Sequence, residues 1–259
     1  MPVDSVLANA AFGDDPARWP LPPAANPREL WLRAVAAGGQ GRYASARADL
    51  APLYRAAGPQ DSLAHSTQAS FLRQLGWHAR ARRWDGRALA LAGPDAEAMA
   101  DAFIGLAADA LGVGRFDASA RALDRAAGPV SSAPPRSRVR LGWVAAELAM
   151  ARGQGATAVS HAERAVDDAA GLGSTRHVVK SSVVLAAARC SAGDLNAART
   201  VADAALDDTN RLGMVPLQWA LACLLADIGS AEHSARDMVA LRDRCADTVR
   251  RRGGEWSVR

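Results

Sequence analysis

The sequence predicts an all-α fold of about six antiparallel helix hairpins stacked side by side, and three observations lead to this prediction. Alanine, the best helix former, supplies 61 of the 259 residues, whereas β-branched and aromatic residues are too few for a sheet-rich fold. Glycine-centred turns recur six times along the chain. An alanine stands at the same distance before each turn, so one structural unit repeats.

The first 26 residues are expected to form a Pro-rich leader ahead of the repeats. Residues 12–27 carry five prolines, Pro16, Pro20, Pro22, Pro23 and Pro27. Because proline lacks an N–H and its ring clashes with the preceding helical turn, this stretch cannot be the interior of a helix. We therefore expect an extended leader over residues 1–26.

Residues 27–249 are expected to form the repeat domain. The turn glycines are Gly41, Gly76, Gly114, Gly153, Gly193 and Gly229. Seven residues before them stand Ala34, Ala69, Ala107, Ala146, Ala186 and Ala222. Twelve residues after them, mostly small again, stand Leu53, Ala88, Ala126, Ala165, Ala205 and Leu241. Small side chains at these positions let the two helices of a hairpin approach closely.

A second recurring signal is an Ala-Gly-Pro tripeptide, which occurs at residues 57–59, 92–94 and 127–129. Glycine supplies the left-handed residue after a helix end, and proline prevents continuation of the helix. The tripeptide therefore predicts that three helices end at equal intervals.

These residues resemble the tetratricopeptide repeat (TPR) family, whose unit of about 34 residues has a small residue at position 8 and glycine at position 15. The family's aromatic at position 17 is kept by Tyr43 and Phe116, and replaced by His78, Gly155, Leu195 and Ala231. The units are also longer, so the chain looks like a divergent long-repeat bacterial member. The resemblance implies an α-solenoid with a right-handed superhelix, whose first helices line a concave groove that takes protein or peptide ligands.

The same resemblance assigns side chains to that groove, because positions 2, 5, 9 and 12 of each first helix face it. The candidate ligand-binding residues at these positions are Trp31, Arg73, Arg140, Trp143, Glu147, Lys180 and Trp219. Basic groups beside tryptophans suit a peptide that carries carboxylates. The asparagines of the family's carboxylate clamp are missing. The alternative is that the tryptophans pack between repeats and the basic residues are solvated.

Two further groups of arginines form candidate basic patches, although the formal net charge is only +4. Arg80, Arg82, Arg83 and Arg87 surround Trp84, with Asp85 as the only acid. Arg250, Arg251 and Arg252 begin a basic C-terminal tail, residues 250–259, which we expect to fray after Gly253 and Gly254, with Trp256 either docked or exposed. Arginine interleaved with aromatics also serves nucleic acids, although a solvated helix face is the default interpretation of the first group.

The motifs of common enzymes are missing. The sequence has no Gly-x-x-x-x-Gly-Lys-Ser/Thr loop, no His-Glu-x-x-His pair and no Gly-x-Ser-x-Gly elbow. Three widely spaced cysteines, Cys190, Cys223 and Cys245, favour neither a disulfide framework nor a zinc site and fit a reducing cytoplasm. We expect no enzyme activity, no cofactor, no metal and no membrane span.

The sequence therefore predicts a cytoplasmic, non-catalytic scaffold or adaptor that binds a protein or peptide, of acidic character, through its groove. The alternative is a regulatory module of a transcription system, whose basic clusters contact nucleic acid or RNA polymerase. Nucleic acid is the less favoured of the two partners.

Overall fold

The computed structural model describes residues 3–55 and 58–257. All regular elements among these residues are helices, comprising thirteen α-helices and one short 3-10 helix. The predicted all-α class is therefore confirmed for the described part of the chain.

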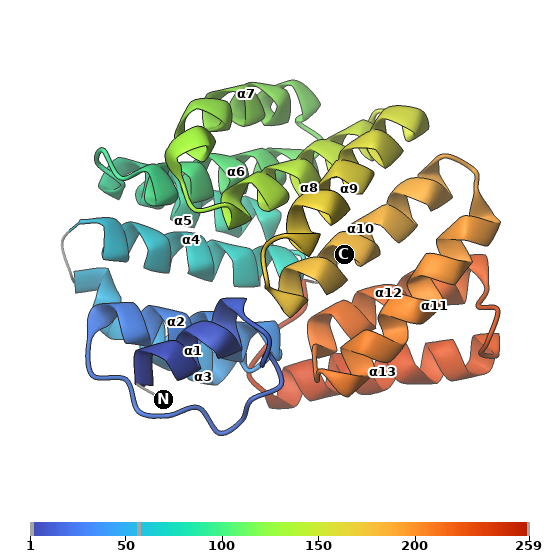
Figure 1. The fold of residues 1–259 in the computed structure, drawn as a ribbon, viewed down its shortest axis with the longest axis horizontal. Helices are drawn as coiled ribbons and strands as arrows, with labels where there is room; N and C mark the ends of the chain where they lie inside the picture. The colour runs from blue at the N-terminus through green and yellow to red at the C-terminus, as the bar shows by residue number, and fades with distance from the viewer. Residues whose placement is uncertain (1–2, 56–57, 258–259) are drawn as a thin grey trace.

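The helices follow one another as an N-terminal helix, α1 (Val3–Phe12), and six antiparallel pairs (Figure 1). The pairs are α2 (Pro27–Gly39) with α3 (Tyr43–Leu50), which the 3-10 helix η1 (Ala51–Arg55) extends; α4 (Pro59–Gln74) with α5 (His78–Leu91); α6 (Ala96–Gly112) with α7 (Phe116–Ser132); α8 (Arg136–Ala151) with α9 (Gly155–Ala170); α10 (Thr175–Ser191) with α11 (Leu195–Arg211); and α12 (Val215–Ile228) with α13 (Ala235–Arg251).

The turn inside each pair uses the predicted glycine. All six of these glycines have φ between 71° and 86°, a left-handed conformation that side chains with a Cβ rarely adopt. The six alanines that precede the turns are each 0 % exposed. Their lack of bulk is therefore used where the helices pack, as the repeat pattern predicted.

The Ala-Gly-Pro signal is correct twice and wrong once. Gly58 and Gly93 have φ of 92° and 56° and stand between helices. In contrast, Gly128 and Pro129 lie inside α7, which continues to Ser132. A proline inside a helix removes one hydrogen bond, but Val130 is buried in the cluster between α6, α7 and α8, and this packing holds the last turn in the helix.

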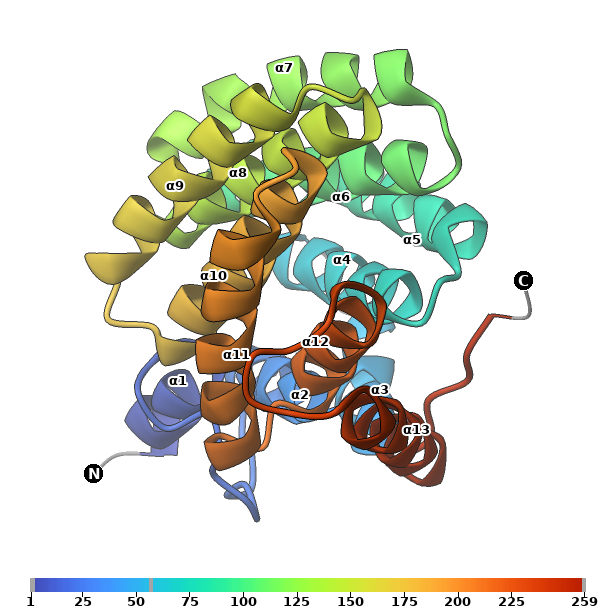
Figure 2. The same ribbon diagram turned by 90° about the vertical axis from the view of Figure 1, so that its right-hand side faces the viewer.

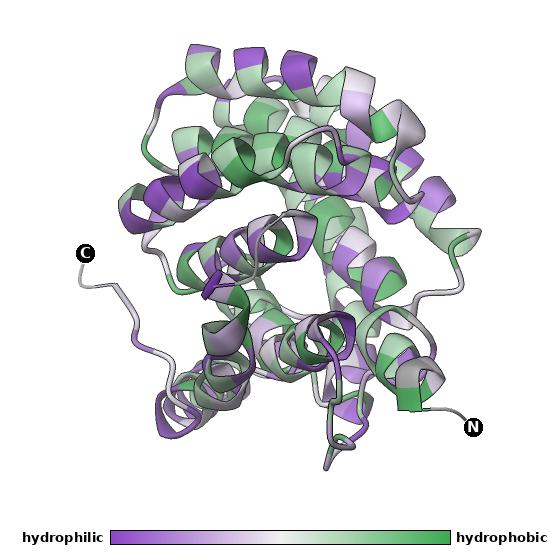
Figure 3. Cartoon of the chain, turned by 90° about the vertical axis from the view of Figure 1, so that its left-hand side faces the viewer, coloured by the Kyte–Doolittle hydropathy of each residue, from purple (hydrophilic) through white to green (hydrophobic). Residues whose placement is uncertain are grey.

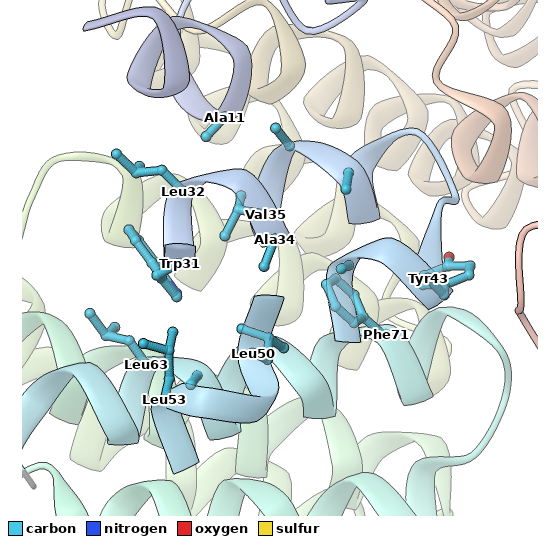
Figure 4. Packing of buried hydrophobic residues seen from close by; sticks show 14 of the residues in the cluster. Ala11, Trp31, Leu32, Ala34, Val35, Tyr43, Leu50, Leu53, Leu63 and Phe71 are labelled. Atoms are coloured by element: carbon cyan, nitrogen blue, oxygen red, sulfur yellow. The ribbon is translucent and has the colours of Figure 1, made fainter. Parts of the chain in front are cut away.

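The expected leader contains a helix. Helix α1 packs on α2 with Leu7 fully buried, whereas residues 13–26 form no helix, as the prolines predicted. Asn26 then begins α2 by accepting a hydrogen bond from the backbone N–H of Glu29 at 2.9 Å. Beneath α2, Trp31 packs beside Leu53 and Leu63, so the first pair, η1 and α4 share one core (Figure 4).

The row of pairs curves back so that the last pair meets the first (Figure 2). Arg252 donates to the Gln40 carbonyl at 2.7 Å, and its own carbonyl accepts from Ala44 N–H at 2.9 Å. Further on, Ser257 N–H donates to the Leu75 carbonyl at 2.8 Å. The expectation that the tail frays after Gly253 and Gly254 is therefore wrong for residues 255–257, because hydrogen bonds hold this segment against the start of the repeats.

Hydrophobic residues concentrate where helices face one another, and hydrophilic ones gather on the outward faces (Figure 3). Within the described part of the chain, none of the helices combines the length and apolarity that a membrane span requires.

Candidate binding cavity

The first helix of every pair lines one cavity of about 400 Å³, which we call the central cavity. Helix α1 adds Phe12 to its wall. All seven residues that the repeat register assigned to the groove line this cavity: Trp31, Arg73, Arg140, Trp143, Glu147, Lys180 and Trp219. The register therefore located the lining, although only the curvature of the array makes it a cavity.

The tryptophans of the wall are fixed by hydrogen bonds and ring contacts. Trp31 is 1 % exposed and donates from Nε1 to Thr67 Oγ1 at 2.9 Å. Trp143 donates to Ser181 Oγ at 2.8 Å and stacks on His177, with ring centroids 5.4 Å apart. Trp31 thus packs between repeats as well, in line with the alternative interpretation, whereas Trp143 remains partly accessible.

Two arginines of α8 converge on one buried carboxylate of α6. Arg136 lies 3.0 Å from Asp101 and 2.7 Å from Glu97, and Arg140 also pairs with Asp101. Burial alone would raise the pKa of Asp101, but the two guanidinium groups outweigh it and lower the pKa. Asp101 is therefore ionised at neutral pH, and burial lowers the pKa of Arg140.

Arg73 reaches the cavity wall, but two buried carboxylates hold its guanidinium. It pairs with Asp85 and lies 3.0 Å from Asp109, and both acids are 0 % exposed. Burial raises the pKa of Asp85 to about 8, against the opposing effect of Arg73. Asp85 Oδ1 and Asp109 Oδ2 have no other described partner, so one proton held between the two acids satisfies both.

Lys180 and Glu147 are the accessible charges of the lining. Their side chains are 29 % and 34 % exposed, and the ammonium lies 3.6 Å from the carboxylate. The Lys180 ammonium also lies 5.9 Å from the centroid of the Trp143 ring. A pair this open to solvent stabilises the fold little, so both groups remain available to a ligand.

Arg176 is the lining residue of most interest that the repeat positions missed. Its Nη1 donates to the Val35 carbonyl at 3.1 Å, and the guanidinium lies against Gly39. Burial, followed by the charge of Arg140, lowers the pKa of Arg176 to about 10. The signal was present in the sequence, because Arg176 and Arg136 stand one helical turn before Lys180 and Arg140 and share their faces.

The two expected basic patches differ in the structure. Arg80, Arg82, Arg83 and Arg87 are all exposed on α5, whereas Asp85 points inward and does not offset them. At the end of α13, Arg250 pairs with Asp247, Arg251 donates to Thr248, and Arg252 is held by Gln40. Of the two groups, only the α5 arginines are all exposed and make no ion pair or hydrogen bond within the described part of the chain.

The described residues offer one group of side chains close enough to share a metal ion. The ligand atoms of Asp207, Glu232 and His233 lie within 4.8 Å of one another. All three residues are exposed, and no second feature of the surface around them points to a metal.

Comparisons with known proteins give no identification: no protein-family model matches the sequence, and no curated protein matches it either.

Proposed function

We propose that this protein is a non-catalytic binding module of the TPR-like α-solenoid class, which holds an acidic peptide segment of a partner protein in its central cavity. The observation that carries the proposal is the convergence of cationic and tryptophan side chains from successive first helices on one space. Its volume of about 400 Å³ lies in the range typical of ligand sites.

The chemistry of the lining supports an acidic ligand. Five of its side chains are arginine or lysine, whereas only Asp101 and Glu147 are acidic. Hydrogen bonds from arginine or lysine to a carboxylate are short and strong. Trp143 and Trp219 add apolar surface for the stem of a peptide side chain.

The test is selection of binders from a displayed library of random peptides, followed by affinity measurement for the selected sequences. We expect enrichment of aspartate and glutamate, and a loss of about 10-fold in affinity for Lys180→Met, since a hydrogen bond to a charged group contributes about 1.5–3 kcal/mol. Arg138→Met is the matched control, because Arg138 lies on the same helix as Arg140 but is 68 % exposed outside the cavity. Selection of peptides without acidic residues, or equal binding by Lys180→Met, would contradict the proposal.

A second candidate function is contact with nucleic acid in a transcription system, through the four exposed arginines of α5. Arg115, at the N-cap of the neighbouring α7, and Arg121 within α7 extend this surface. Binding of this kind weakens steeply with salt, because it releases counterions from the phosphate backbone. A mobility shift at low salt that disappears in Arg83→Glu would support it, and no shift at low salt would exclude it.

A further inference from the structure

We infer that Arg176 is the anchor for a carboxylate of the ligand, so that the bound molecule supplies the counter-charge that the central cavity lacks. This inference rests on the proposed function, since it requires that a ligand enters the cavity, and it names the chemical group that is recognised.

The ion pairs of the lining single out Arg176. Arg73, Arg136, Arg140 and Lys180 each pair with at least one carboxylate. For Arg176, no ion pair with a carboxylate exists among the residues that the structure describes. A charge removed from water without a partner destabilises the folded protein unless another molecule compensates for it.

The hydrogen bonds of Arg176 also leave its guanidinium free to bind a ligand. A guanidinium carries five N–H donors in a planar fork, and the hydrogen bond from Arg176 to the Val35 carbonyl uses one of them. The remaining donors of Arg176 have no acceptor within the described part of the protein. Two parallel N–H groups match the two oxygens of a carboxylate, which makes this the group that the free side of the fork fits best.

The surroundings of Arg176 strengthen the attraction for an anion. Arg136 and Arg140 add positive potential from α8, and both act on Arg176 to lower its pKa, after burial, to about 10. Arg176 therefore remains charged at neutral pH. A positive potential within a space lined by apolar walls raises the local concentration of anions.

An independent observation also points to a ligand. Ser66 Oγ is buried, lines the same cavity from α4 and has no hydrogen-bond partner in the described structure. The two other hydroxyls that α4 places in the lining are satisfied, because Thr67 accepts from Trp31 and Ser70 donates to the Thr67 carbonyl. Ser66 is thus a second polar group of the lining that a bound polar molecule would satisfy.

The competing role for Arg176 is purely structural. Val35 lies near the C-terminal end of α2, where the helix dipole favours a cation, so Arg176 would then serve only to join α10 to α2. The two roles make opposite predictions for stability. Removal of a binding group that lacks a counter-charge leaves the fold as stable or more stable, whereas removal of a structural contact weakens it.

The experiment is calorimetric titration of the full chain with an acetylated tri-glutamate peptide and, separately, with glutarate and its neutral analogue glutaramide. We expect the wild type to bind the two anions and not glutaramide, and Arg176→Gln to lose at least about 10-fold in affinity. Tighter binding of the peptide than of glutarate would identify a partner segment as the source of the carboxylate. The reverse order would identify a free dicarboxylate, and either result supports the anchor.

The matched control is Arg199→Gln. Arg199 also donates to a backbone carbonyl, that of Ile228 at 2.9 and 2.6 Å, but it lies outside the cavity. Equal peptide binding by wild type and Arg176→Gln would overturn the anchor and leave the proposed function standing. A larger loss of unfolding free energy in Arg176→Gln than in Arg199→Gln would assign Arg176 the structural role. Failure of both anions to bind the wild type would also overturn the anchor, while the peptide selection decides the proposed function separately.

Discussion

The two buried acids that share Arg73 make the stability of this protein depend on pH. Asp85 and Asp109 are 0 % exposed, and one guanidinium cannot neutralise both. Asparagine at position 85 has the shape of a protonated aspartate, and its amide N–H can donate to Asp109 as the shared proton does. Asp85→Asn therefore removes the need for this proton with little change of shape.

The size of the effect follows from the shift of the pKa of Asp85 from 3.8 to about 8. The folded state holds this proton more tightly than the unfolded state, so the contribution to stability is full below pH 4 and is lost as pH rises toward 8. One pKa unit corresponds to about 1.4 kcal/mol, which sets an upper limit of about 4 kcal/mol for the loss between pH 4 and pH 7. Asp85→Asn needs no proton, and we expect it to be more stable than the wild type by about 2 kcal/mol at pH 7.

The assay is urea unfolding followed by circular dichroism between pH 4.5 and pH 8. The difference between Asp85→Asn and the wild type should grow with pH and approach zero at the acidic end. Asp167→Asn, an exposed acid on α9, is the control and should show no such trend. A difference that does not change with pH, or a variant less stable than the wild type at pH 7, would refute the reasoning.

Three other predictions concern the turns, the tail and the cavity wall. Gly193→Ala should lower the free energy of unfolding by about 1–2 kcal/mol, because a Cβ at φ 85° is strained even though the space around it is open. Gly171→Ala, at φ −79°, should be neutral or stabilising, and urea unfolding of both variants tests the difference. Trp256→Ala should lower the free energy of unfolding by about 1–2 kcal/mol and shift the remaining tryptophan emission to the red, because its ring centroid lies 4.3 Å from that of Trp219. Unchanged emission would show that the two rings are not in contact. Burial and the neighbouring arginines lower the pKa of His177 well below 6.5, so its contribution to stability is present above that pH and falls below it. An NMR titration should find the imidazole still neutral at pH 6.5, where an unperturbed histidine is half charged, and a half-charged ring would contradict the burial of this side chain.

Local signals explain why the repeat could be predicted from sequence. The positions of Gly41 and its five counterparts require a left-handed backbone, and those of Ala34 and its counterparts require a small side chain. The residue type at each position therefore indicates the local structure directly. The same local logic was wrong at Pro129, where burial of Val130 in a core shared by three helices outweighs the loss of one hydrogen bond.

The rest of the site depends on contacts that no single repeat contains. In the sequence, Asp85 stands among four arginines and is expected to offset their charge. In the structure, its side chain is instead buried against Gly105 of the next pair. Similarly, Arg176 reaches Val35 only because α10 returns to α2, and the tail docks only because the last pair meets the first. The sum of many small rotations between pairs sets this closure, and a repeat pattern does not record those rotations.

The contact between the last pair of helices and the first limits how many pairs this chain can contain. Open helical arrays gain or lose a unit at modest cost, because each unit contacts only its neighbours. Here, one pair more or less would separate Arg252 from Gln40 and Ser257 from Leu75, so an insertion or deletion of a whole unit removes the contacts between the two ends at once. We therefore expect relatives of this chain to keep the same number of pairs, and to vary mainly on the outward faces of the second helices.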